Sequence, residues 1–97
     1  MKIIVKVPET SNKWKLHWAG FGKHFTRADT LINGIERRLL RTAKDKKLSI
    51  LVKYDKDSSN ESLASLNPAY LLYTLSCFLE DYLSAETLRR IEKKYGY

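Results

Sequence analysis

The sequence predicts a small α+β protein, a two-layer sandwich in which helices cover one face of a three-stranded sheet. Two observations support this fold class. Three segments alternate apolar and polar residues with the period of a β-strand, and two longer segments repeat apolar residues with the period of an α-helix. The expected order is ββαβα(α), with a short final helix, within one domain that spans residues 1–97.

The three predicted strands cover residues 2–7, 13–18 and 48–54. Successive strand residues point to opposite faces, so each strand divides into two sets of side chains. The first set is apolar: Ile3, Val5, Val7, Trp14, Leu16, Trp18, Leu48, Ile50, Val52 and Tyr54. The second set is rich in lysine: Lys2, Ile4, Lys6, Lys13, Lys15, His17, Ser49, Leu51 and Lys53. This sheet should have a core face and an open cationic face, which indicates an anionic partner.

The connections between the predicted strands suggest how the sheet is ordered. Turn-forming residues at 8–12 predict a hairpin, so the first two strands should be antiparallel. A helical crossover then leads to the third strand, which should run parallel to the second and therefore antiparallel to the first. Placing that strand beside the first gives the order 2-1-3 and a mainly antiparallel sheet. Residues 19–24 are expected to form a flexible link, and residues 55–67 a polar loop.

The first helix is predicted over residues 27–44. Thr26 followed by Asp29 fits a capping box in its acidic form. Gly34 costs about 1 kcal/mol relative to alanine in the middle of a helix, so we expect it to allow a close approach of backbone or ligand. The predicted buried face consists of Ala28, Leu31, Ile32, Ile35, Leu39 and Ala43.

Two further helices are predicted in the second half of the chain. Asn67 followed by Pro68 is a strong start signal, because asparagine caps a helix and proline suits its first position. This helix should cover residues 69–83 and bury a wide leucine-rich face. Ser84 is expected to cap a last helix over residues 85–95, with its basic residues outward.

Charge is distributed unevenly along the chain, whose formal net charge is +7. Residues 13–53 carry eleven Lys and Arg against three Asp and Glu, a net of +8, and residues 54–86 carry one Lys against six acidic residues, a net of −5. A basic block of this size is typical of proteins that bind nucleic acids or other anionic surfaces. Solubility alone is the simpler explanation.

We expect the basic block to contact nucleic-acid phosphates with little base selectivity. Arg37 and Arg41 lie one helical turn apart, and the planar fork of arginine suits phosphate oxygens. The sheet face contributes lysines, and the glycine-containing link before the first helix is a weaker candidate for anion binding. The predicted contacts are Lys13, Lys15, Lys23, Arg27, Arg37, Arg38, Arg41 and Lys44.

A protein-interaction module is the second hypothesis, for example an adaptor or inhibitor encoded by a phage or mobile element. Tyr70 and Tyr73 lie on the less apolar side of the second long helix, and surface tyrosines often anchor protein interfaces. Acidic residues lie close to them, so one molecule would have a basic pole and an aromatic, acidic pole. This polarity would suit a protein partner or a homodimer.

The sequence shows no catalytic, metal or cofactor motif. His17 and His24 raise a third hypothesis, a ribonuclease-like toxin, but no orienting residue accompanies them. The acidic loop from residue 55 begins like a calcium-binding loop but does not match the rest of that pattern. Asn60 occupies the position that requires glycine, and Leu66 the position that requires glutamate. We therefore predict a protein that is not an enzyme and uses no cofactor.

The remaining features predict a cytoplasmic protein. Cys77 is the only cysteine, so no disulfide can form within the chain, as is usual in a reducing compartment. The first residues lack the apolar stretch of a signal peptide. The longest apolar-rich run, residues 69–79, is shorter than the roughly 20 residues that a membrane helix needs, so no membrane association is expected.

Overall fold

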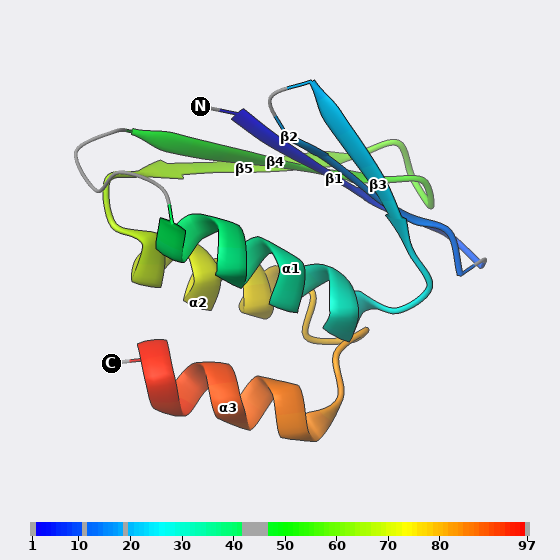
Figure 1. Cartoon of the computed structure of the whole chain (residues 1–97). Coiled ribbons are helices and arrows are strands. Elements are labelled where there is room, and N and C mark those ends of the chain that lie inside the picture. The colour runs from blue at the N-terminus through cyan, green and yellow to red at the C-terminus, as the bar shows by residue number, and fades with distance from the viewer. Residues whose placement is uncertain (1, 11, 19, 42–46, 97) are drawn as a thin grey trace.

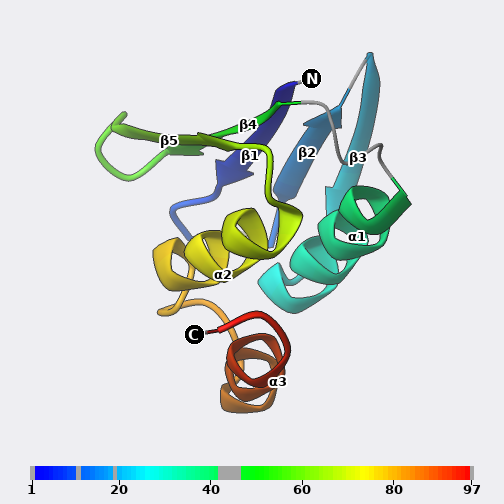
Figure 2. The same ribbon diagram turned by 90° about the vertical axis from the view of Figure 1, so that its left-hand side faces the viewer.

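The computed structural model describes residues 2–10, 12–18, 20–41 and 47–96. A single sheet with the strand order β3-β2-β1-β4-β5 is covered on one face by α1 and α2, and α3 packs beneath these helices, away from the sheet (Figures 1 and 2). The elements are β1 (Lys2–Val7), β2 (Trp14–Trp18), β3 (Phe21–Phe25), α1 (Ala28–Arg41), β4 (Leu48–Tyr54), β5 (Asn60–Ser65), α2 (Pro68–Phe78) and α3 (Ala85–Tyr95). The predicted α+β class is confirmed.

The sheet has five strands rather than the predicted three. The predicted strands are present as β1, β2 and β4, and their predicted order 2-1-3 is preserved as β2-β1-β4. The segment 19–24, expected as a link, contributes most of β3, and the expected loop 55–67 contains β5. Both additions pair with one neighbour only, at the two edges of the sheet.

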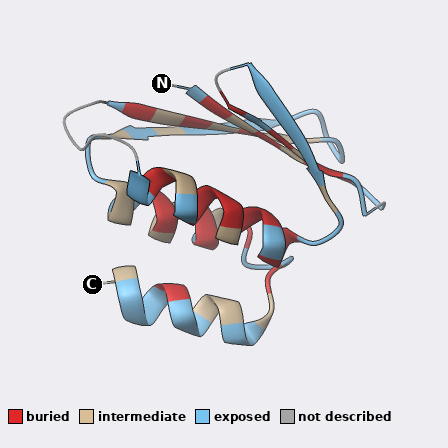
Figure 3. Cartoon of the chain, in the orientation of Figure 1, coloured by how far each residue is buried: buried red, intermediate tan, exposed pale blue. Residues whose placement is uncertain are grey.

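The edge strands were missed because hydrophobic alternation reports burial, and these strands bury little. Four of the five residues of β3 are exposed, as its mostly pale blue ribbon shows (Figure 3). In β5, Leu63 is the one bulky apolar residue, and it is half-buried. Their place in the sheet rests on the backbone ladders with β2 and β4, which side-chain periodicity does not reveal.

Strand β3 also changes the direction in which the chain enters the helical crossover to β4. It runs antiparallel to β2 and returns the chain to the direction of β1. Helix α1 therefore leads to a β4 that is parallel to β1, with Ile3 opposite Ile50 and Val5 opposite Val52. The other three strand pairs are antiparallel, so the sheet is mainly antiparallel, as predicted. The predicted direction of the third strand is wrong, because β4 is parallel to β1 and antiparallel to β2.

The core lies between the sheet and the two long helices, on the side that strand parity predicted. Every residue of the predicted apolar face is buried except Tyr54, which is half-buried. Burial and the nearby Glu61 carboxylate, to which its hydroxyl donates a hydrogen bond, raise the pKa of Tyr54 to about 12. Helix α1 adds Leu31, Ile35 and Leu39, which are fully buried.

The predicted capping box at the start of α1 is wrong, because the Asp29 carboxylate turns toward another helix. One oxygen accepts hydrogen bonds from the Ser84 backbone N–H (3.0 Å) and hydroxyl (3.1 Å), and the other pairs with Arg27 (2.9 Å). Burial would raise the pKa of Asp29, but these bonds outweigh it and hold the pKa below its ordinary value. Ser84 caps α3 as predicted, so Asp29 joins the starts of α1 and α3.

Glu36 makes the second connection between α1 and α3. Glu36 is only 8% exposed. Its carboxylate accepts hydrogen bonds from Arg90 (3.0 Å), Lys94 (3.3 Å) and the Tyr95 hydroxyl. Burial would raise the pKa of Glu36, but the hydrogen bonds and the positive charges outweigh it and lower the pKa. A carboxylate on α1 thus holds three residues of the last helix.

We expect Glu36→Gln to lower the free energy of unfolding by roughly 1–3 kcal/mol at pH 7, because two cations and the half-buried Tyr95 hydroxyl lose a charged acceptor that is itself buried. Urea denaturation would measure the change, with the exposed Glu80→Gln as control. The pKa of Glu36 is lower in the folded protein than in the unfolded chain, so its ionised carboxylate stabilises the fold fully at a pH above the unfolded-state pKa. This stabilisation is lost as the pH falls through the folded-state pKa. The difference in unfolding free energy between variant and wild type should therefore become smaller in acid. Equal stabilities at pH 7 would contradict this role.

Candidate nucleic-acid interface

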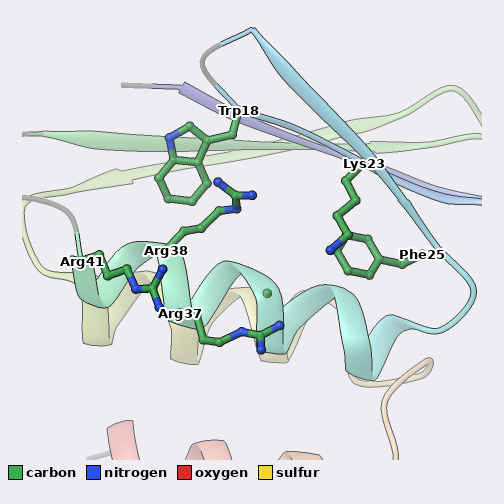
Figure 4. Close-up of a pocket in the computed structure, with 7 residues that line it drawn as sticks. Trp18, Lys23, Phe25, Arg37, Arg38 and Arg41 are labelled. Atoms are coloured by element: carbon green, nitrogen blue, oxygen red, sulfur yellow. The ribbon is translucent and has the colours of Figure 1, made fainter.

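Four cationic side chains converge on one open pocket between β3 and α1, with a volume of about 440 Å³ (Figure 4). Among the described residues, its lining contains no Asp or Glu. The lining residues are Trp18, Lys23, Phe25, Gly34, Arg37, Arg38 and Arg41. Positive charge and aromatic rings therefore meet here, and none of the described lining residues carries a carboxylate.

Lys23 comes from the edge strand β3, and the alternation of side chains along this strand decides which face of the sheet Lys23 is on. Lys23 lies opposite Leu16 of β2, so its side chain is on the helix-covered face of the sheet. Lys23 is exposed because β3 lies at the border of that face. Its ammonium lies 5.2 Å from the centroid of the Phe25 ring, a cation–π distance that holds the charge over the pocket wall.

Helix α1 supplies the three arginines along the rim of its buried face. Arg37 and Arg41 are exposed and one turn apart. The Arg38 guanidinium lies 4.3 Å from the ring centroid of Phe21 and 5.9 Å from that of Trp18. Figure 4 shows Arg38 extending from α1 toward Trp18. Stacking on rings orients a guanidinium without consuming its N–H donors.

Gly34 allows a close approach, but by an aromatic side chain and not by the backbone or ligand that the sequence predicted. A Cβ at this position would lie 3.3 Å from the Phe25 ring, closer than ordinary contact. The absence of a side chain on α1 thus lets the ring from β3 lie directly against the helix. Phe25 and Gly34 together form part of the lining from which the cations extend.

Three of the other predicted phosphate contacts lie elsewhere. Lys13 is exposed just before β2, and Lys15 lies on the uncovered face of the sheet. Arg27 is ten residues before Arg37, about 15 Å along the helix, and pairs with Asp29. Lys44 lies outside the described residues. Of the eight predicted contacts, the structure brings Lys23, Arg37, Arg38 and Arg41 together.

The sequence prediction missed the aromatic part of the pocket. Trp18 was assigned to the core, where it is buried, yet it also lines the pocket. Phe21 and Phe25 fell in or beside the supposed link. Their spacing with Lys23, in which Phe, Lys and Phe alternate with polar or small residues, is a weak strand signal that could have placed all three on one face.

The remaining candidates are scattered. Tyr70 of α2 is 39% exposed, and Tyr73 is half-buried. His17 and His24 are exposed on the uncovered face of the sheet, away from the pocket. Within the described ranges, no group of three or more His, Cys, Asp or Glu residues could hold a metal ion. No helix of the described chain has both the length and the apolar character needed to cross a membrane.

Comparisons with known proteins add no relative. No family model matches the chain, and searches of curated proteins and of solved structures gave no significant match.

We expect Arg37→Gln to raise the free energy of unfolding by roughly 0.2–0.5 kcal/mol at low salt, because it removes the like-charge pair with Arg41 one turn away. Urea denaturation at about 20 and 500 mM salt would measure the effect, which should vanish at high salt. Lys56→Gln, which removes one exposed charge from a loop where Asp55 and Asp57 are its neighbours, should give no such gain. A salt-independent change, or an equal gain in the control, would contradict electrostatic repulsion at the pocket.

Proposed function

We propose that this protein is a basic, non-enzymatic binding protein that contacts nucleic-acid phosphates with little base specificity. The observation that supports this most strongly is the convergence of Lys23, Arg37, Arg38 and Arg41 on one pocket whose described lining contains no carboxylate. Like charges repel, so an anion that enters the pocket would relieve the repulsion among these cations.

The chemistry of the pocket suits phosphate. Guanidinium groups bind phosphate oxygens in a bidentate manner, and the lysine adds a mobile point charge. Each phosphate that is neutralised releases condensed counterions, which supplies sequence-independent affinity. Contacts to phosphates fix position and carry no direct sequence information, so low base specificity is expected.

The same lining argues for binding rather than catalysis. Its described residues include no histidine, cysteine, serine or carboxylate, and these are the usual general bases and nucleophiles. The two histidines that raised the toxin hypothesis lie on the other face of the sheet. We therefore propose the pocket as an anion-binding site without hydrolytic activity.

A protein-interaction module is the second candidate function, supported by exposed apolar groups near the start of α2. Leu66 is 57% exposed and Tyr70 is 39% exposed. Exposed aromatic and aliphatic side chains often anchor protein partners. A partner at this surface would not need the pocket, so the two functions can be separated by mutation.

We expect the double variant Arg37→Glu, Arg41→Glu to weaken binding of labelled DNA and RNA at least ten-fold and to reduce the salt slope by about 2, since two phosphate contacts are lost. Fluorescence anisotropy over a salt series would measure both. The matched control is Arg89→Glu, Lys93→Glu, which makes the same charge change on an exposed pair of α3.

The control separates a local site from net charge. Equal weakening by both double variants would show that overall charge alone governs binding, and would contradict the pocket. A wild-type affinity that does not change with salt would contradict phosphate binding altogether. Tyr73→Ala should leave nucleic-acid affinity unchanged, whereas loss of a protein partner in that variant would favour the interaction module.

A further inference from the structure

The uncovered face of the sheet carries a second basic feature, a row of lysines in direct register. Lys6 of β1 lies opposite Lys15 of β2 and opposite Lys53 of β4. Neighbouring strands are about 4.8 Å apart, and like charges directly opposite one another destabilise a sheet. All three lysines are half-buried, so their stems lie along the sheet. We call these three residues the lysine row.

The lysine row meets the pocket at the edge strand β3. Lys15 lies opposite His24, and His24 directly follows Lys23 of the pocket. Because consecutive strand residues point to opposite faces, Lys23 and His24 place the two basic features on either side of one exposed strand. Only the width of β3 separates the pocket from the start of the row.

The two features differ in what they offer a nucleic acid. On the uncovered face, the described strand residues include no Asp or Glu and no aromatic ring other than histidine. That face can therefore contact phosphates but provides few surfaces for stacking. The pocket side has rings, and Phe21 at the sheet edge is 43% exposed. Bases that are not paired stack on such rings.

We infer that the ligand is a single strand of nucleic acid, which leaves the pocket, crosses the edge strand β3 and continues along the lysine row. This inference rests on the proposed function and adds the class of nucleic acid and its path. A duplex has a persistence length of about 50 nm and cannot fold around one strand of a sheet. A single strand can, and it exposes bases to Phe21.

The length of the path agrees with a single-strand site. From β3 to β4 the path crosses three strand spacings, about 14 Å, of which the lysine row covers two, and the pocket extends the path on the other side of the edge. Proteins that bind single strands through a basic groove and aromatic rings cover about 4–16 nucleotides. A short oligonucleotide should therefore fill the pocket alone, and a longer one should also reach the row.

The test measures binding of labelled oligothymidylates of 5 and 15 nucleotides, and of a 15-base-pair duplex, to wild type and to the double variant Lys6→Gln, Lys53→Gln. We expect the variant to bind the 15-mer on the order of ten-fold more weakly, with a salt slope reduced by about 1.4, and to bind the 5-mer within two-fold of wild type. The duplex should bind more weakly than the 15-mer. Lys56→Gln, Lys93→Gln removes the same charge and should change none of these affinities.

Three results would overturn the path. They are an unchanged 15-mer affinity in the lysine variant, equal weakening in the control variant, or a duplex that binds as tightly as the 15-mer. Lys15→Gln alone provides a second test if the double variant does not fold. Failure of the proposed function would look different, because the 5-mer would then bind Arg37→Glu, Arg41→Glu as tightly as wild type.

Discussion

Burial of the aliphatic face of α1 against the sheet is the constraint on which the rest of the structure depends. Leu31, Ile32 and Ile35 are completely buried, and each such side chain contributes about 1.5–3 kcal/mol by leaving water. This burial fixes the rotation of the helix about its axis. The arginines that follow in the sequence must then emerge at the rim beside β3, where strand parity has already placed Lys23.

The two acidic residues of α1 explain why the pocket keeps its charge. Glu36 is next to Arg37 in the sequence, but its carboxylate is held by Arg90, Lys94 and Tyr95 of α3. Asp29 is held in the same way by Ser84 and Arg27. The last helix thus engages the acids of α1 on the side away from the sheet, so neither lines the arginine pocket. Helix α1 therefore carries both the carboxylates that hold α3 and the arginines of the proposed anion site, and these carboxylates do not neutralise the arginines in the pocket.

The sequence predicted the strands whose side chains are buried, and it missed the edge strands, which are held in the sheet mainly by backbone hydrogen bonds. The alternation in β1, β2 and β4 reports core contact, so their faces and order were predictable. In the β3 segment, Phe21 stands between Gly20 and Gly22, and four of the five residues are exposed. Phe21 and Phe25 therefore gave little indication of a strand. For the site, helical spacing brought Arg37 and Arg41 together in advance. Their meeting with Lys23 depends on the β2–β3 hairpin, whose exposed second strand has no clear apolar alternation, and on the packing of α1 against the sheet.

The most direct test of the pocket is a two-dimensional ¹H–¹⁵N NMR titration of the folded protein with an oligothymidylate of five nucleotides. We expect the largest shift changes, including those of the arginine Nε–H groups, in residues 21–25 and 34–41, and we expect added salt to reverse them. Shift changes concentrated on α2 and α3, or a spectrum unchanged by the oligonucleotide at low salt, would contradict the assignment of this pocket as a phosphate-binding site.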